Sequence, residues 1–372
     1  MKPCALPAEG KTTSTGTVLI TLVLLTGLPL LGALTAGLPL DRYLEFPPLT
    51  RYVTPAAFSW PVFLSMALFV LVVVGPILYR IVVSSPPVKD RGLQLQRFPW
   101  WGWLGLVWLA GAWLVAWNRF DWAQSLQRHT FTPLWLGYIV VVNALTFKRG
   151  GNCLLRDRFT YLFVLFIASA LFWWYFEFLN RFVQNWHYTG IGTFTPGAYV
   201  LFGTLSFSTV LPAVVSTRDL LATFPRLTSG LATYIKFPPT NPCRLASAAL
   251  IVSAIALANI GRWPDYLFPM LWMAPLMVLV SVQALRGEAH VLKGMASGNW
   301  RSIWLAALAA LVCGFFWELW NWNSLAKWQY AVPFVSRFQL FEMPLLGYAG
   351  YLPFGVTCVA LAEVVRSRLI KD

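Results

Sequence analysis

The sequence predicts an all-α membrane protein whose chain crosses the bilayer about ten times. Of its 372 residues, 58% are hydrophobic and only 11% are charged, and the mean hydropathy is +0.63. Soluble domains carry about 25% charged residues, so this composition excludes an ordinary soluble protein. The apolar residues are gathered into runs of about 20, the length that a helix needs to cross roughly 30 Å of hydrocarbon. Because no water bonds the backbone there, each run is expected to be helical.

Ten such runs follow one another along the chain, and each is a predicted transmembrane helix. They cover residues 17–38, 60–83, 100–118, 131–147, 159–180, 197–217, 245–260, 267–285, 302–321 and 345–366. The runs at 131–147 and 245–260 are the shortest of the ten.

The loops between these runs predict how the chain lies in the membrane. Lys and Arg are frequent before the first run, in every second loop and in the C-terminal tail, and the other loops have fewer of them. Cytoplasmic loops hold an excess of Lys and Arg. We therefore expect a multi-pass protein of the cell (inner) membrane with both termini in the cytoplasm. The net charge of +14 is spread over these short loops, so nucleic acid is not an expected partner.

Two parts of the chain share a pattern at a nearly constant offset of about 140 residues. The matched features are Arg97-Phe98-Pro99 with Lys236-Phe237-Pro238, Glu177-x-x-Asn180 with Glu318-x-x-Asn321, Trp186-x-Tyr188 with Trp328-x-Tyr330, Leu201-Phe202 with Leu340-Phe341, and Leu211-Pro212 with Leu352-Pro353.

The match predicts three parts: residues 1–96 with two extra helices, a first four-helix repeat at 97–225 and a second at 236–368. An even number of spans gives both repeats the same orientation, and a shared site is then expected between them.

The repeated polar residues are the candidate site, because the predicted topology places all of them near the outer surface. Residues three apart share a helix face, so each Glu points the same way as its Asn. Arg119 and Arg262 end the third and seventh runs on the same side, each followed by an acid. A symmetric structural clamp would preserve the same pattern without any chemistry.

Glu342, in the stretch LFEMPLLGYAGYLPF, occurs in the second repeat only, since Gly203 stands at the matching place in the first. An asymmetric active site could use such an acid. In the alternative interpretation Glu342 only precedes Pro344 at the start of a helix, where an acid complements the helix dipole.

A site with few charged residues and many aromatic side chains favours acid–base chemistry on a hydrocarbon. A carboxylic acid kept neutral by an apolar site can protonate a double bond, ring faces stabilise the cation, and a carboxylate takes a proton back. Such a site needs no metal or nucleotide cofactor, and the cysteines and histidines have no metal-ligand spacing. The predicted catalytic residues are Glu318, Glu342, Glu177, Asn321 and Asn180. The predicted substrate-binding residues are Arg119, Arg262, Trp186, Tyr188, Trp328, Tyr330 and Trp317.

The segment Glu318…Trp328-Gln329-Tyr330, followed by Phe341-Glu342-Met343-Pro344, resembles the membrane-embedded, heterodimer-type carotenoid (lycopene) cyclases. The likeness covers roughly 50 residues, with a fainter echo at Glu177…Trp186-His187-Tyr188. The Pro-x-Glu-Glu element of that family is not present, and each half has four predicted spans rather than three. The resemblance implies an isoprenoid as the apolar lipid substrate.

Two other classes of function remain open at the level of sequence. Internal repeats are common in transporters, and in a carrier of a lipid or small amphipathic solute Arg119 and Arg262 would hold an anionic headgroup. A non-catalytic subunit of a membrane complex would use the rings as a contact surface. The expected partners are accordingly membrane lipids, an apolar lipid substrate or other membrane subunits.

Overall fold

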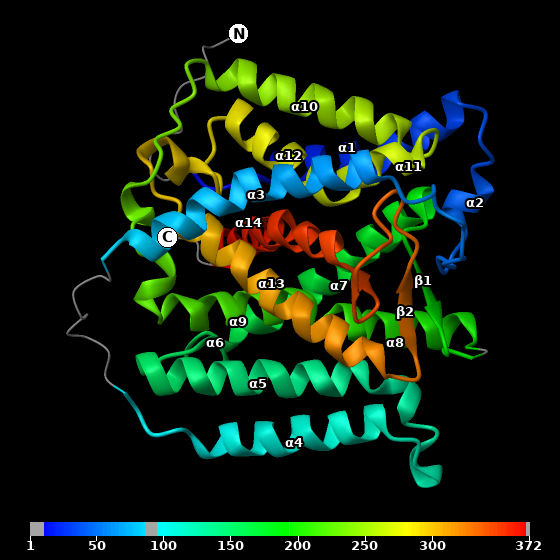
Figure 1. Ribbon diagram of the computed structural model, residues 1–372, viewed down its shortest axis with the longest axis vertical. Coiled ribbons are helices and arrows are strands. Elements are labelled where there is room, and N and C mark those ends of the chain that lie inside the picture. Colours follow the sequence, from blue (N-terminus) through cyan, green and yellow to red (C-terminus); the bar gives the residue numbers. More distant parts are fainter. Residues whose placement is uncertain (1–10, 86–94, 193, 370–372) are drawn as a thin grey trace.

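The computed structural model describes residues 11–85, 95–192 and 194–369, which are mostly helical (Figure 1). The longer helices are α1 (Thr15–Thr35), α3 (Trp60–Val83), α4 (Trp100–Trp117), α5 (Phe131–Gly150), α7 (Phe159–Val183), α8 (Pro196–Phe207), α9 (Val210–Ala222), α10 (Pro242–Asn259), α12 (Pro269–Leu285), α13 (Arg301–Trp322) and α14 (Tyr351–Leu369). One-turn helices are α2 (Asp41–Leu44), α6 (Leu154–Asp157) and α11 (Pro264–Leu267).

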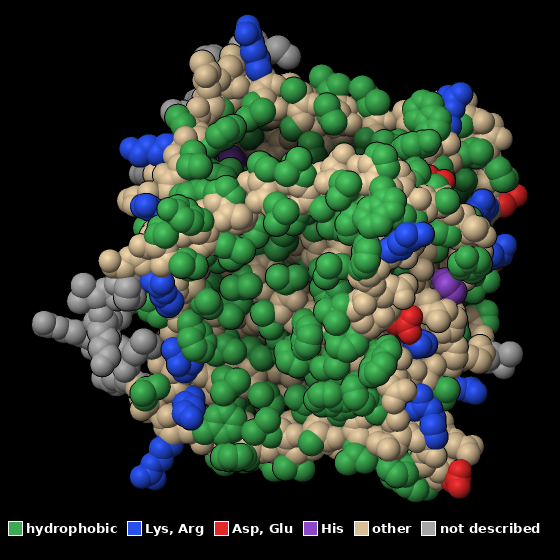
Figure 2. Space-filling model, in the orientation of Figure 1, with side chains coloured by type: hydrophobic (Ala, Val, Ile, Leu, Met, Phe, Trp, Pro, Cys, Tyr) green, Lys and Arg blue, Asp and Glu red, His purple; other side chains and the backbone are tan. Residues whose placement is uncertain are grey.

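A multi-pass membrane protein is confirmed at the level of helix length and hydropathy. In the described part of the chain, nine helical segments are long and apolar enough to cross a membrane, counting α8 with α9 as one segment and Leu345–Leu369 as another. Helix α12, with 17 residues, is apolar but shorter. Each of the ten predicted runs coincides with helical structure. Figure 2 shows hydrophobic side chains over the middle of one face, with Lys and Arg gathered toward its two ends.

The run predicted at 197–217 is two helices rather than one. Pro212 has no N–H to continue the helix bonding, and the hydroxyl of Ser169 on α7 inserts at the break. It donates to the carbonyl of Phe207 at 2.6 Å and accepts from the amide of Leu211 at 3.0 Å. A side chain inserted between turns is a common cause of a broken helix. Ser169 therefore satisfies backbone groups that the apolar surroundings cannot.

Two short antiparallel strands form a ribbon at one end of the bundle (Figure 1). They are β1 (Trp186–Thr189), which follows α7, and β2 (Lys327–Tyr330), which follows α13. Trp186 pairs with Tyr330, His187 with Gln329, and Tyr188 with Trp328. The strands β3 (Gln339–Leu340) and β4 (Met343–Pro344) make a second small hairpin. We call this the ribbon end. At the opposite end, Arg368 near the end of α14 donates to Thr15 at the start of α1.

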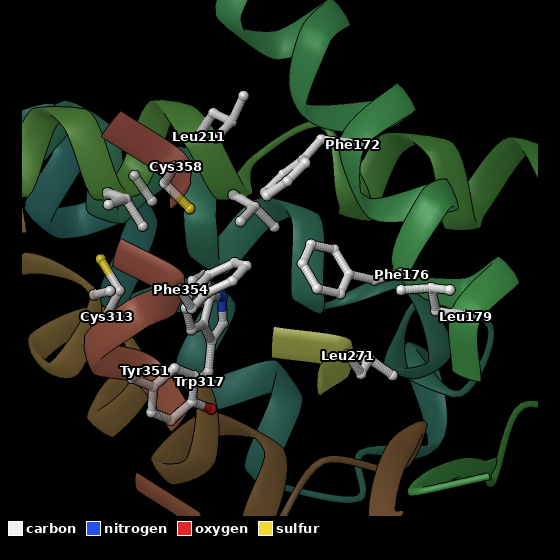
Figure 3. Close-up of a cluster of buried hydrophobic side chains, with 14 of the residues drawn as sticks. Phe172, Phe176, Leu179, Leu211, Leu271, Cys313, Trp317, Tyr351, Phe354 and Cys358 are labelled. Carbon is white, nitrogen blue, oxygen red and sulfur yellow. The ribbon is translucent and has the colours of Figure 1, made fainter. Parts of the chain in front are cut away.

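The core lies where α7, α9, α12, α13 and α14 meet (Figure 3). Phe354 of α14 is central to it: its ring lies 5.9 Å from that of Phe172, 5.6 Å from Phe176 and 6.2 Å from Trp317. Edge-on and offset ring pairs at these distances stabilise a packed interior beyond simple burial. The aromatic surplus of the sequence is thus used in the interior as well as at the membrane surface.

Helix α3 differs from the others in being attached mainly at its ends. It slants across the face shown in Figure 1, and Ile77 is its one buried residue. Ser59, just before it, donates to the carbonyl of Phe334, and Arg226 donates to the carbonyls of Val82 and Ser84 at its other end. Its middle forms a side wall of the cavity described next.

Candidate functional site

A cavity of about 960 Å³ lies beside the core, lined from several helices and from the β1–β2 ribbon. The lining is almost entirely apolar and rich in rings. All five aromatic residues that the sequence assigns to substrate binding line it: Trp186, Tyr188, Trp328, Tyr330 and Trp317. Its volume lies in the range of cavities that hold small-molecule ligands.

Glu177 lies close behind this wall, on the last turns of α7, and is 0% exposed. Its Oε1 accepts three hydrogen bonds, from the indole N–H of Trp173 at 3.0 Å, the indole N–H of Trp186 at 3.1 Å and the hydroxyl of Tyr188 at 2.6 Å. Its Oε2 is buried and has no hydrogen-bond partner. All three donors line the cavity, so a single layer of side chains separates the carboxyl from it.

Glu318 is held in the same way on α13 and is also 0% exposed. The hydroxyls of Tyr330 and Tyr351 each donate to its Oε1 at 2.7 Å, and its Oε2 is buried without a partner. The indole of Trp328 donates to the Tyr330 hydroxyl at 2.7 Å. Figure 3 shows Tyr351 beside Trp317, whose ring lies 5.8 Å away. Each carboxyl therefore meets the cavity through phenol and indole groups.

The strand tyrosines remain protonated donors. Burial, followed by the nearby Glu177, raises the pKa of Tyr188 well above its ordinary value of 10. Burial and then Glu318 do the same to the pKa of Tyr330. A phenol that keeps its proton at neutral pH can donate to its carboxyl and relay a proton between that carboxyl and a molecule in the cavity.

Asn180 and Asn321 bind the strands and not the carboxyls. The Asn180 amide donates to the carbonyl of Trp186 at 2.8 Å and accepts from the amide of Asn185 at 2.8 Å. Asn321 donates to the carbonyl of Trp328 at 2.8 Å and accepts from its amide at 2.9 Å. These two predicted catalytic residues therefore act on the glutamates only indirectly. They fix the strands that carry the ring donors.

Glu342 lies in the turn between β3 and β4, and its partner is Lys327. The Lys327 ammonium lies 2.5 Å from Glu342 Oε1, with both side chains largely buried. In the sequence match, Lys327 aligns with Asn185 and Glu342 aligns with Gly203. The acid and its cation therefore occur together, and both of the residues aligned with them are uncharged. The structure places Glu342 as the counter-ion of Lys327.

The two arginines expected to bind substrate lie away from the cavity lining. Arg119 donates to the carbonyls of Ala116 and Asn323, tying the end of α4 to the end of α13. Arg262 is exposed, and its guanidinium lies 5.4 Å from the ring centre of Trp263. Arg119 connects two helix ends, and neither arginine is among the residues that line the cavity.

Three residues near the cavity were missed from the sequence: Tyr351, Asn185 and Arg128. Asn185 could have been found as the residue before the Trp-x-Tyr motif. Tyr351 reaches Glu318 from a later helix, and Arg128 comes from a loop, so no local spacing indicates either of them.

No family model, curated protein or solved structure matches this chain.

Proposed function

We propose that this chain is a ten-span membrane enzyme that performs acid–base chemistry on an isoprenoid or another apolar lipid. The reaction is a cyclisation, isomerisation or hydration. None of these oxidises or reduces the lipid, so no electron donor or acceptor is needed. The reacting lipid occupies the cavity between two four-helix repeats, at residues 97–225 and 236–368. The observation that carries the proposal is the pair of buried carboxyls, each joined by ring donors to one aromatic cavity.

The arrangement of the helices supports the duplication. Helix α4 packs along α5 as α10 packs along α12, and α9 and α14 each pack on both α7 and α13. The ribbon register supports it independently. Trp186 pairs with Tyr330, while Tyr188 pairs with Trp328, which is the same pair after exchange of the two halves. The central pair, His187 with Gln329, then lies on a pseudo-two-fold axis running along the membrane normal.

The proposed chemistry follows from what each group can do. A proton on Glu318 passes through the hydroxyl of Tyr330 or Tyr351 to a double bond of the lipid, and the phenol regains its proton from the carboxyl. The surrounding ring faces, including that of Trp317, stabilise the carbocation by cation–π attraction. Glu177, through Tyr188, takes a proton from the product cation. The resemblance to the carotenoid cyclases prompts the choice of an isoprenoid.

The experiment begins with the lipid that purified wild-type protein carries, identified by mass spectrometry of organic extracts. That lipid is returned to delipidated protein, and its conversion is followed. We expect Glu318→Gln to lower the conversion rate at least about 100-fold, the contribution of a positioned acid or base. The amide keeps the size of the side chain, so the variant should fold and still bind the lipid.

The matched control is Glu45→Gln, which removes an acid paired with Arg51 on the surface of the molecule. It should convert the lipid at the wild-type rate. Full conversion by a folded Glu318→Gln protein would rule out the acid–base assignment.

A lipid carrier is the second candidate, and the position of α3 favours it. The cavity lining extends from Trp328 at the ribbon to Trp300 and Trp304 near the opposite end, with α3 along its side. Because one residue of α3 is buried, its displacement would expose little core. A carrier would move labelled lipid between the leaflets of a vesicle without forming any new chemical species.

A further inference from the structure

Asn185 is a buried polar side chain without a protein partner. It is 3% exposed, and its backbone amide and carbonyl are bonded to Asn180 and to the amide of Ala331. Its side chain lines the cavity and has no hydrogen-bond partner in the described residues, and its Oδ1 is fully buried. Leaving a buried amide oxygen without a hydrogen-bond partner is unfavourable. The Nδ2 of the same side chain is the amide atom left to donate to a polar group on a bound ligand.

Arg128 lines the same cavity and has no acid paired with it in the part of the chain that the structure describes. The loop at Gly192 lies directly against its guanidinium, because a Cβ added to Gly192 would come 2.7 Å from Arg128 Nη1. Gly192 also has a φ of +65°, which favours glycine. Arg128 is itself exposed, so the loop holds its guanidinium at the open edge of the cavity, where the charge is available to a ligand.

The matching position in the proposed second repeat has no unpaired polar side chain. Lys327, which corresponds to Asn185, also lines the cavity, but its ammonium is paired with Glu342. The lining therefore has one uncompensated cation and one unpaired amide among the described residues, both from the first half. This asymmetry predicts one polar headgroup per chain.

We propose that the cavity binds a single-chain lipid with an anionic phosphate headgroup, held by Arg128 and Asn185, with its hydrocarbon chain among the rings. The guanidinium donates charge-assisted hydrogen bonds to the phosphate oxygens. The Asn185 Nδ2 donates to another phosphate oxygen. Asn185 adjoins Trp186, whose indole is bonded to Glu177, so the first carbons of the chain lie beside the Glu177 group. This inference rests on the proposed function in placing a lipid in the cavity, and it names the class of that lipid.

The test compares two ligands that differ only in the headgroup, geranylgeranyl phosphate and geranylgeraniol. Their affinities for the full chain are measured in detergent micelles by native mass spectrometry. We expect wild type to bind the phosphate at least about ten-fold more tightly. Arg128→Gln should weaken phosphate binding about 10- to 100-fold, the range for hydrogen bonds to a charged group, and leave alcohol binding unchanged. Asn185→Ala should weaken phosphate binding several-fold.

Arg262→Gln is the matched control, since it removes an exposed arginine outside the cavity lining, and it should bind both ligands as wild type does. Equal affinity of wild type for the phosphate and the alcohol would overturn the proposal. So would an Arg128→Gln protein that folds normally and binds the phosphate as tightly as wild type.

Two further experiments are needed. One tells which kind of lipid supplies the phosphate headgroup, and the other tells failure of the headgroup site from failure of the proposed enzyme. Competition with dioleoyl phosphatidic acid tells whether a bilayer lipid with the same phosphate can take the site, or only the single-chain lipid. Glu318→Gln should bind geranylgeranyl phosphate with wild-type affinity. Tight binding of that phosphate, combined with an absence of acid–base turnover of any lipid, would refute the proposed enzyme and leave the headgroup site intact.

Discussion

At the scale of single residues, Glu177 and Glu318 show how an apolar interior can hold a carboxyl without a counter-ion. Each Oε1 receives its hydrogen bonds from phenol and indole groups and none from Lys or Arg. A neutral donor stabilises the carboxyl without bringing a second charge out of water, which would cost several kcal/mol more. This gives a physical reason for Trp and Tyr close to the repeated acids.

The Lys327–Glu342 pair yields a prediction at the same scale. Glu342→Gln should destabilise the protein by about 1 kcal/mol, because it leaves the Lys327 ammonium without its carboxylate. The double variant Lys327→Asn/Glu342→Gln should recover most of that loss, since both charges are then absent, as they are in the first half. Denaturant unfolding in micelles measures the four stabilities of this cycle.

Lipid conversion is followed in the same variants. If Glu342 is only a counter-ion, the double variant keeps the wild-type rate. A folded double variant that no longer converts the lipid would show that Glu342 takes part in the reaction.

The candidate residues could be predicted from the sequence because the motif occurs twice, but their roles could not. The repeated motif identified Glu177, Glu318 and the Trp-x-Tyr tyrosines that bond to them. It did not indicate that Asn180 and Asn321 bind strand backbone, since the spacing of three residues only places each Asn on the face of its Glu. Tyr351 was missed because its bond to Glu318 joins different helices.

At the scale of helices, apolar runs located every long segment, while the breaks within them were not predicted. Hydropathy sums side-chain character over a window, and the α8–α9 break depends on one proline and on the Ser169 hydroxyl from α7. Pro353 matches Pro212 in the sequence and in the structure: each is the third residue of an α-helix that follows a shorter helical segment, α9 after α8 and α14 after the 3-10 helix Leu345–Gly350. The matched prolines therefore stand at matched interruptions of the two spans.

The crossing of α1 and α10 gives a prediction for helix packing. Gly32 of α1 meets α10 so closely that a Cβ added there would lie 1.5 Å from the carbonyl oxygen of Ala258. Gly32→Ala must therefore push the two helices apart, and we expect a loss of about 2–3 kcal/mol in the free energy of unfolding. Denaturant unfolding in micelles would measure the loss.

Gly27→Ala on the same helix is the control, because nothing lies within 4 Å of a Cβ added there. Alanine favours helix formation over glycine, so this variant should be as stable as wild type or slightly more so. Equal destabilisation by both substitutions would mean that α1 and α10 do not cross at Gly32.

At the scale of the whole molecule, the proposed architecture depends on whether α12 crosses the membrane. Its 17 residues give a length of about 25 Å, a few ångströms less than an average hydrocarbon layer. Local thinning of the bilayer accommodates a shortfall of this size at modest cost. Its packing along α10 and α14 supports a full crossing. Without that crossing, the two repeats would no longer share one orientation, and the alternation of basic loops would fail after α10.

Cysteine labelling in intact cells tests this crossing, using a background in which the native cysteines are replaced. Tyr266→Cys and Ala289→Cys place exposed thiols before and after α12. We expect a membrane-impermeant maleimide to label Tyr266→Cys from outside and to reach Ala289→Cys only after the membrane is permeabilised. Permeabilised cells also control for thiols that are simply unreactive. Labelling of both positions from the same side would make α12 a re-entrant or surface helix. The pseudo-two-fold axis would then relate only the remaining helices, and the cavity would lose its membrane-spanning wall on that side.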